Sequence, residues 1–70
     1  MGKRYLIDTN VVFDDDIIAK TIDVRRLYKI KLPDAIIAAT TLTNTFTLIT
    51  SNTKDFKNIK GLKIIHPVDL

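Results

Sequence analysis

Carboxylate and carboxamide side chains occur at three places in the chain where a buried element is expected to end or begin. Asp8 follows a first apolar run, Asp34 opens an apolar segment just after a proline, and Asn52 and Asp55 follow a second apolar run. Carboxylates that lie close together repel one another, and a hard divalent cation with oxygen ligands removes that repulsion. The pattern therefore indicates a divalent-metal site, if the fold brings the three places together.

Each of these residues also has an ordinary structural explanation. Asp8 alone suits a turn or a helix N-cap, and Asp34 alone is favoured beside the positive end of a helix dipole. Their joint occurrence next to buried strands is what favours a shared carboxylate site. The run Asp14 to Asp16 is better explained as solvated charge at a helix start, and His66 as a surface residue beside Pro67.

The elements that position these side chains follow from the spacing of apolar residues. Residues 4–7, 46–49 and 62–65 are short apolar runs typical of buried strands. The segment from about 15 to 29 has apolar residues at helical spacing. A second helix is expected to begin at Pro33, and its residues 35–42 are apolar nearly all round, which is typical of a helix between a sheet and another layer. We therefore predict one α/β domain over residues 1–70, a small parallel sheet of about three strands with helices packed on it.

Finer features of the helices and turns can also be predicted. Asp14 is expected to cap the first helix, Asn44 to end the second, and Gly61 to adopt a positive φ in a turn before the last strand. Turns are expected over residues 50–54 and 58–61. The apolar stripe of the first helix is expected to contain Ile17, Thr21, Val24 and Tyr28, widened by Ile18, Ile22 and Leu27. The threonines of the second helix, Thr40, Thr41 and Thr43, are expected to pack rather than act as nucleophiles.

Composition narrows the class of protein. Hydrophobic residues make up 46% of the 70 residues and charged residues 27%, a globular balance for a small domain. The chain has no cysteine, so neither disulfides nor thiolate–metal bonds contribute. Its apolar stretches are too short to span a bilayer and no signal-peptide pattern opens it, so we expect a cytoplasmic protein without membrane contact.

The net charge of +3 leaves two interpretations open. Four lysines are crowded near the end of the chain and could attract a polyanion: Lys54, Lys57, Lys60 and Lys63. An ordinary solvated, lysine-rich surface is the simpler explanation, because surface lysines mostly serve solubility.

Three segments in this order resemble the PIN-domain nucleases, and among them the VapC-type toxins of prokaryotic toxin–antitoxin pairs. Residues 5–10, Tyr-Leu-Ile-Asp-Thr-Asn, are similar to the opening strand and first metal-binding Asp of that family. Residues 32–40 resemble its most recognisable helix start, and residues 48–56 its late strand and loop. Residues 61–65 would close the sheet, so the resemblance runs over most of the chain.

The resemblance implies cleavage of RNA phosphodiester bonds by a Mg²⁺- or Mn²⁺-activated water. Asp8 and Asp34 would hold the cation directly, and Asn52 or Asp55 would approach it, either one through water. The catalytic group would be Asp8, Asp34 and Asp55, and the metal ligands Asp8, Asp34 and Asn52. Contacts with the RNA substrate would come from Thr9, Asn10, Thr50 and Lys54.

The chain also departs from the family. Family members are nearly twice this long and carry further helices, at least one more strand and a metal-site Glu before the Pro33 helix, whereas all 8 acidic residues here are Asp. A truncated, three-layer PIN-like fold would bind metal more weakly, since even outer-shell losses reduce metal affinity about 10- to 100-fold. It would also expose one edge of the first strand, which favours a homodimer. The alternative function is therefore an inactive, shortened PIN scaffold that binds itself or an antitoxin.

Two other carboxylate-based families fit less well. Phosphotransferases of the haloacid-dehalogenase kind have a second Asp two positions after the strand-end nucleophile, where this chain has Asn10. Receiver domains have an acidic pair after their first strand and a full five-strand unit, which 70 residues do not accommodate.

Overall fold

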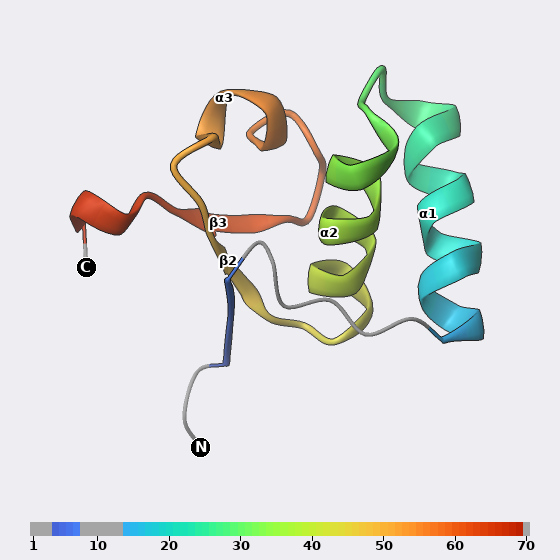
Figure 1. Cartoon of the computed structure of the whole chain (residues 1–70), viewed down its shortest axis with the longest axis horizontal. Helices are drawn as coiled ribbons and strands as arrows, with labels where there is room; N and C mark the ends of the chain where they lie inside the picture. The colour runs from blue at the N-terminus through green and yellow to red at the C-terminus, as the bar shows by residue number, and fades with distance from the viewer. Residues whose placement is uncertain (1–3, 8–13, 70) are drawn as a thin grey trace.

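The computed structural model describes residues 4–7 and 14–69, which form a three-stranded sheet with helices packed on it (Figure 1). The strands are β1 (Tyr5–Ile7), β2 (Thr47–Ile49) and β3 (Lys63–Ile65). They are parallel and lie in the order β1-β2-β3. The predicted α/β fold with a small parallel sheet is confirmed.

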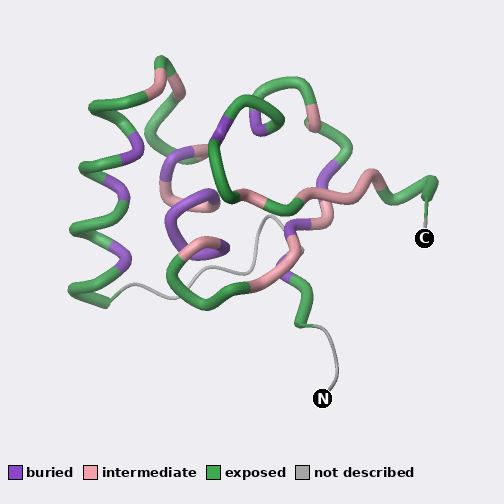
Figure 2. The backbone as a smooth tube through the Cα atoms, turned by 180° about the vertical axis from the view of Figure 1, so that it is seen from behind, coloured by how far each residue is buried: buried purple, intermediate pink, exposed green. Residues whose placement is uncertain are grey.

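Two antiparallel helices form the layers beside this sheet. In Figure 1, α2 (Leu32–Thr43) lies between the sheet and α1 (Asp15–Leu27). Three side chains of α2, Ala35, Ala38 and Ala39, are completely buried, and their small size lets both neighbouring layers approach the helix closely. Figure 2 shows the buried residues concentrated along α2 and on the inner side of α1. The predicted sandwiched position of this helix is therefore confirmed.

The core joins all of these layers. Leu6 of β1 and Leu48 of β2 lie in one apolar cluster with Val24 of α1 and with two residues from the segment between β2 and β3, Phe56 and Ile59. Leu48, in the middle strand of the described sheet, is completely buried. The cluster fixes the strand ends relative to the start of α2.

The ends of the two long helices follow the sequence prediction. The Asp14 side chain accepts a hydrogen bond from the Ile17 backbone N–H at 2.9 Å, and so caps α1. Asn44 ends α2 and donates from its side chain to the Thr40 carbonyl at 2.9 Å. Gly61 has φ +83°, as expected.

The predicted width of the apolar stripe on α1 was wrong. Ile17, Thr21 and Val24 are buried, whereas Ile18 is 49% exposed, Ile22 54% and Leu27 75%. The helix contacts α2 along one narrow side, and no other described element covers its flanks. The apolar residues beyond that contact therefore face solvent in the described part of the molecule.

Two short helices lie outside the predicted elements. The turn expected over residues 50–54 was wrong in its second half, because α3 (Thr53–Phe56) begins at Thr53 and is anchored by the buried Phe56. A 3₁₀ turn, η1 (Pro67–Asp69), follows β3. No helix in residues 4–7 and 14–69 is long and apolar enough to cross a membrane.

The threonines of α2 are explained mainly by packing. Thr40 and Thr41 are buried, and their hydroxyls donate to the carbonyls of Ile36 and Ile37 at 2.8 Å. The packing prediction is confirmed for these two, while Thr43 is exposed instead.

Candidate functional site

The carboxyl ends of β1 and β2 lie side by side, at the same level of the sheet. The parallel register pairs Ile7 with Ile49, and Ile49 with Ile65. Side chains that follow these strands are therefore delivered to one edge of the sheet, where ligands of open α/β sheets bind. Asp8, Thr9 and Asn10 follow Ile7 in the sequence and lie outside the described residues, so their metal and substrate roles stay predictions.

Asp34 lies at the same end of the molecule as these strand ends. It is half-buried in the first turn of α2, and the far end of that helix connects through a short turn to the beginning of β2. The helix consequently runs opposite to the strands, and its amino end lies toward their carboxyl edge (Figure 1). The positive end of the helix dipole favours a carboxylate at this position.

A chain of three hydrogen bonds follows β2. The backbone N–H of the buried Thr50 donates to the Ile65 carbonyl at 3.1 Å, and the Thr50 hydroxyl accepts from the Asn52 N–H at 3.1 Å. The Asn52 side-chain amide then donates to Asp55 Oδ2 at 2.9 Å. Asn52 and Asp55 are both exposed, and the sheet holds them as one unit through Thr50.

These side chains leave oxygen atoms for a ligand. The bond between Asn52 and Asp55 uses an amide hydrogen and one carboxylate oxygen, so Asn52 Oδ1 and Asp55 Oδ1 are not engaged in it. Together with the Asp34 carboxylate they are hard oxygen donors, the type that Mg²⁺ and Mn²⁺ prefer. The donor types therefore fit the predicted cation.

The described residues alone do not assemble a metal site. Among residues 4–7 and 14–69 no group of three or more acidic or histidine side chains is close enough to hold a metal ion. A metal site at this edge of the sheet would need a further ligand from outside the described residues, the part that the sequence analysis predicts for Asp8. Lys54, which was predicted to contact the substrate, is exposed on α3.

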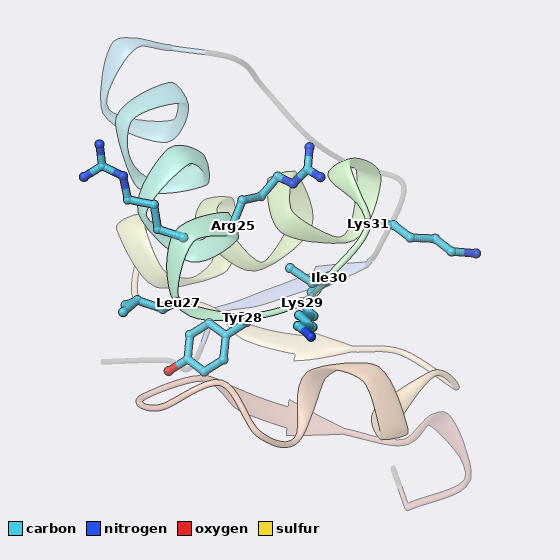
Figure 3. A pocket seen from close by; sticks show the side chains of 7 residues that line it. Arg25, Leu27, Tyr28, Lys29, Ile30 and Lys31 are labelled. Carbon is cyan, nitrogen blue, oxygen red and sulfur yellow. The ribbon is translucent and has the colours of Figure 1, made fainter.

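The turn between α1 and α2 is a feature that the sequence prediction did not single out. Residues 25–31 line an open pocket of about 600 Å³ (Figure 3). Their sequence, Arg-Arg-Leu-Tyr-Lys-Ile-Lys, has four basic residues and no acidic one, a signal that was available from the sequence.

Comparison with known proteins gives one informative similarity. No protein-family model matches the chain, and no curated protein matches it. The chain is similar to a chain in a solved structure described as a toxin–antitoxin complex from Klebsiella pneumoniae, with 46% sequence identity and a TM-score of 0.66. The match covers 77% of this chain and 43% of that chain, so this chain spans less than half the length of the protein it matches.

Proposed function

We propose that the chain is the toxin component of a toxin–antitoxin pair, and that it is a divalent-metal-dependent ribonuclease of the PIN-domain, VapC type. The similarity to a chain of a toxin–antitoxin complex supports the first part. The resemblance of residues 5–10, 32–40 and 48–56 to the nuclease segments supports the second. The antitoxin would be the protein partner.

One structural observation carries the nuclease proposal. Ile7 and Ile49 are paired in the parallel register, so β1 and β2 end at the same edge of the sheet. Asp8 is the next residue after Ile7, and the loop from Thr50 to Asn52 follows Ile49. Asp34 is in the first turn of α2, and the amino end of that helix lies toward the same edge. The segments that contain Asp8, Asp34 and Asn52 would therefore all begin near the carboxyl edge of the sheet, which supports a shared role in catalysis.

Each side chain has a role that fits its position. Asp8 and Asp34 would hold Mg²⁺ or Mn²⁺, and the unit of Asn52 and Asp55 would approach the cation directly or through water. When bound, the cation would supply an acidified water as nucleophile and neutralise charge at the phosphorus. Thr50 orients Asn52 through its hydroxyl, and the exposed Lys54 would contact a phosphate of the RNA.

An RNA-cleavage assay with matched variants tests this function. Asp34→Asn and Asp8→Asn should each reduce the rate of Mn²⁺-dependent cleavage by about 100-fold or more, because each removes a charged ligand. Asp23→Asn and Asp69→Asn make the same chemical change at exposed positions on α1 and η1, and should leave the rate unchanged. Wild-type activity in Asp34→Asn would contradict the proposal.

A second candidate function, a self-associating or antitoxin-binding scaffold without activity, is favoured by the open edge of β1. In the part of the chain that the structure describes, β1 pairs only with β2, and Tyr5 is 45% exposed. An apolar strand edge of this kind favours pairing with a second copy, so we propose a homodimer.

Sedimentation at several protein concentrations tests the dimer. Wild-type protein should show a concentration-dependent mass, and Tyr5→Lys should shift it toward the monomer because an edge lysine opposes strand pairing. The exposed Ile18→Lys on α1 is the control for added charge and should keep the wild-type mass. A wild-type mass that stays monomeric at every concentration would rule the dimer out.

A further inference from the structure

Positive charge is concentrated around the turn that joins α1 to α2. Five exposed residues define what is called here the basic turn surface: Arg25, Arg26, Lys29, Lys31 and Lys60. Between residues 25 and 31 there is no acidic residue, whereas the beginning of α1 has three consecutive aspartates. The charge of the described chain is therefore separated along α1, with the basic end at the turn.

A single hydrogen bond connects the two segments of this surface. The backbone N–H of Lys60 donates to the Tyr28 hydroxyl at 3.0 Å, across 32 positions of sequence. In Figure 3 the Tyr28 ring points away from α2, while Arg25 and Lys31 extend from the other side of the turn. The bond holds the Lys60 backbone beside Tyr28, so basic residues from two distant segments belong to one region of the surface.

The folded chain leaves these cations without internal neutralisation. Within residues 4–7 and 14–69, the structure gives none of the five side chains an ion pair with a carboxylate. Basic residues at a helix end also stabilise the helix, but this accounts only for Arg25 and Arg26 in the last turn of α1. Lys29, Lys31 and Lys60 lie outside any helix, so the helix dipole does not account for them.

The basic turn surface lies next to the candidate site. Lys31 precedes α2, and Asp34 is in the first turn of the same helix. A polyanion bound across the turn would therefore pass close to the start of α2. An acidic protein would be attracted to this surface as strongly as RNA by charge alone. It would, however, bring further carboxylates toward Asp34. A phosphodiester strand would instead bring the group that the candidate site is proposed to cleave.

We propose that the basic turn surface binds the sugar–phosphate backbone of single-stranded RNA and leads the strand to the Asp34 edge of the sheet. This inference rests on the proposed ribonuclease function and adds to it the location of the substrate. Lys29, Lys31 and Lys60 contact phosphates, and Tyr28 holds the two segments at a fixed separation. Binding of this kind is independent of sequence and falls steeply with salt.

Fluorescence anisotropy with a labelled single-stranded RNA tests the proposal. EDTA is present throughout, so that binding is measured without cleavage and does not depend on a working metal site. The test variant is Lys29→Ser with Lys60→Ser, and the control is Lys20→Ser with Lys63→Ser, which removes the same charge. Lys20 is exposed on α1 before the basic end of that helix, and Lys63 begins β3 at the amino edge of the sheet.

The measured quantity is the slope of log K against log salt concentration. For single-stranded nucleic acid, each phosphate neutralised by the protein contributes about 0.7 to the magnitude of this slope. The test variant removes two lysines, so its slope should be smaller in magnitude than that of the wild type by about 1.4. The control variant should keep the wild-type slope. Tyr28→Phe, which loses only the hydroxyl that accepts from Lys60, should weaken RNA binding while the circular dichroism spectrum stays unchanged.

Two outcomes would overturn the inference. One is an equal change of slope in the test and control variants, which would mean that net charge alone attracts RNA. The other is loss of poly-glutamate binding in the test variant with RNA binding intact, which would mean that the surface accepts an acidic protein. If the slopes behave as expected but no cleavage is seen with Mn²⁺, the RNA surface stands and the catalytic proposal fails.

Discussion

The side-chain amide of Asn52 donates a hydrogen bond to Asp55 Oδ2 at 2.9 Å, and so ties the loop after β2 to the first turn of α3. The sequence alone could not say which of these two residues would approach a cation. The bond places Asn52 Oδ1 and Asp55 Oδ1, the two oxygens that it does not use, on neighbouring side chains. A change at either residue should therefore alter the other.

Asn52→Asp should make stability depend more strongly on metal. The substitution replaces a donor by a carboxylate opposite Asp55, so the metal-free protein should lose less than about 1 kcal/mol, because the pair is exposed. Added Mn²⁺ should then raise the melting temperature more than in wild type. Asn52→Ala loses the bond without adding charge and is the control. Equal metal-induced shifts in the two variants would remove Asn52 from the site.

Asp14→Ala should destabilise α1 through loss of its cap. The side chain accepts from the Ile17 N–H, and loss of such a bond costs about 1 kcal/mol, or about 4–8 °C in melting temperature for a domain of this size. Asp14→Ser keeps an acceptor and should melt close to wild type. Identical melting of the Ala and Ser variants would show that the cap contributes nothing.

Gly61→Ala should destabilise the turn before β3. An added Cβ would lie 3.8 Å from Leu42 Cδ2, an ordinary contact, so the cost comes from the backbone. At φ +83° that cost is about 1–2 kcal/mol for an L-residue, and Gly61→Asn should cost less because Asn tolerates this region. Chemical denaturation measures both variants, and an Asn variant less stable than the Ala variant would contradict the explanation.

Strongly patterned elements were predictable from sequence for simple physical reasons. The nearly all-round apolar character of residues 35–42 predicted a helix covered on both sides, and α2 is enclosed by α1 and the sheet. A cap was predictable from the run Asp14 to Asp16, because aspartate is a favoured N-cap residue and its charge is also favoured in the first turn of a helix. The parallel sheet was predicted from an apolar composition rich in Ile, Leu, Val and Ala, which suits buried parallel strands under helices.

Other features could not be read from the pattern. Helical spacing places Ile18 and Ile22 beside the buried residues of α1 but does not say how wide the contact with α2 is, and both are about half exposed. The single turn of α3 is too short for any periodicity, although the buried Phe56 after a polar run is a trace of it. The bond between Tyr28 and Lys60 joins residues far apart in sequence, and only the fold reveals it.

Thermal unfolding of the wild type and of Asp34→Asn, with and without Mn²⁺, tests the proposed metal site most directly. The metal should raise the stability of the wild type, by about 2.7 kcal/mol at a concentration of 100 times Kd. Asp34→Asn should lose this rise, and without metal its stability should stay within about 1 kcal/mol of the wild type, because relief of carboxylate repulsion opposes the loss of a favourable charge at the start of α2. If Mn²⁺ stabilises the Asp34→Asn variant as much as the wild type, or stabilises neither, no divalent cation is bound through Asp34 at the carboxyl edge of the sheet.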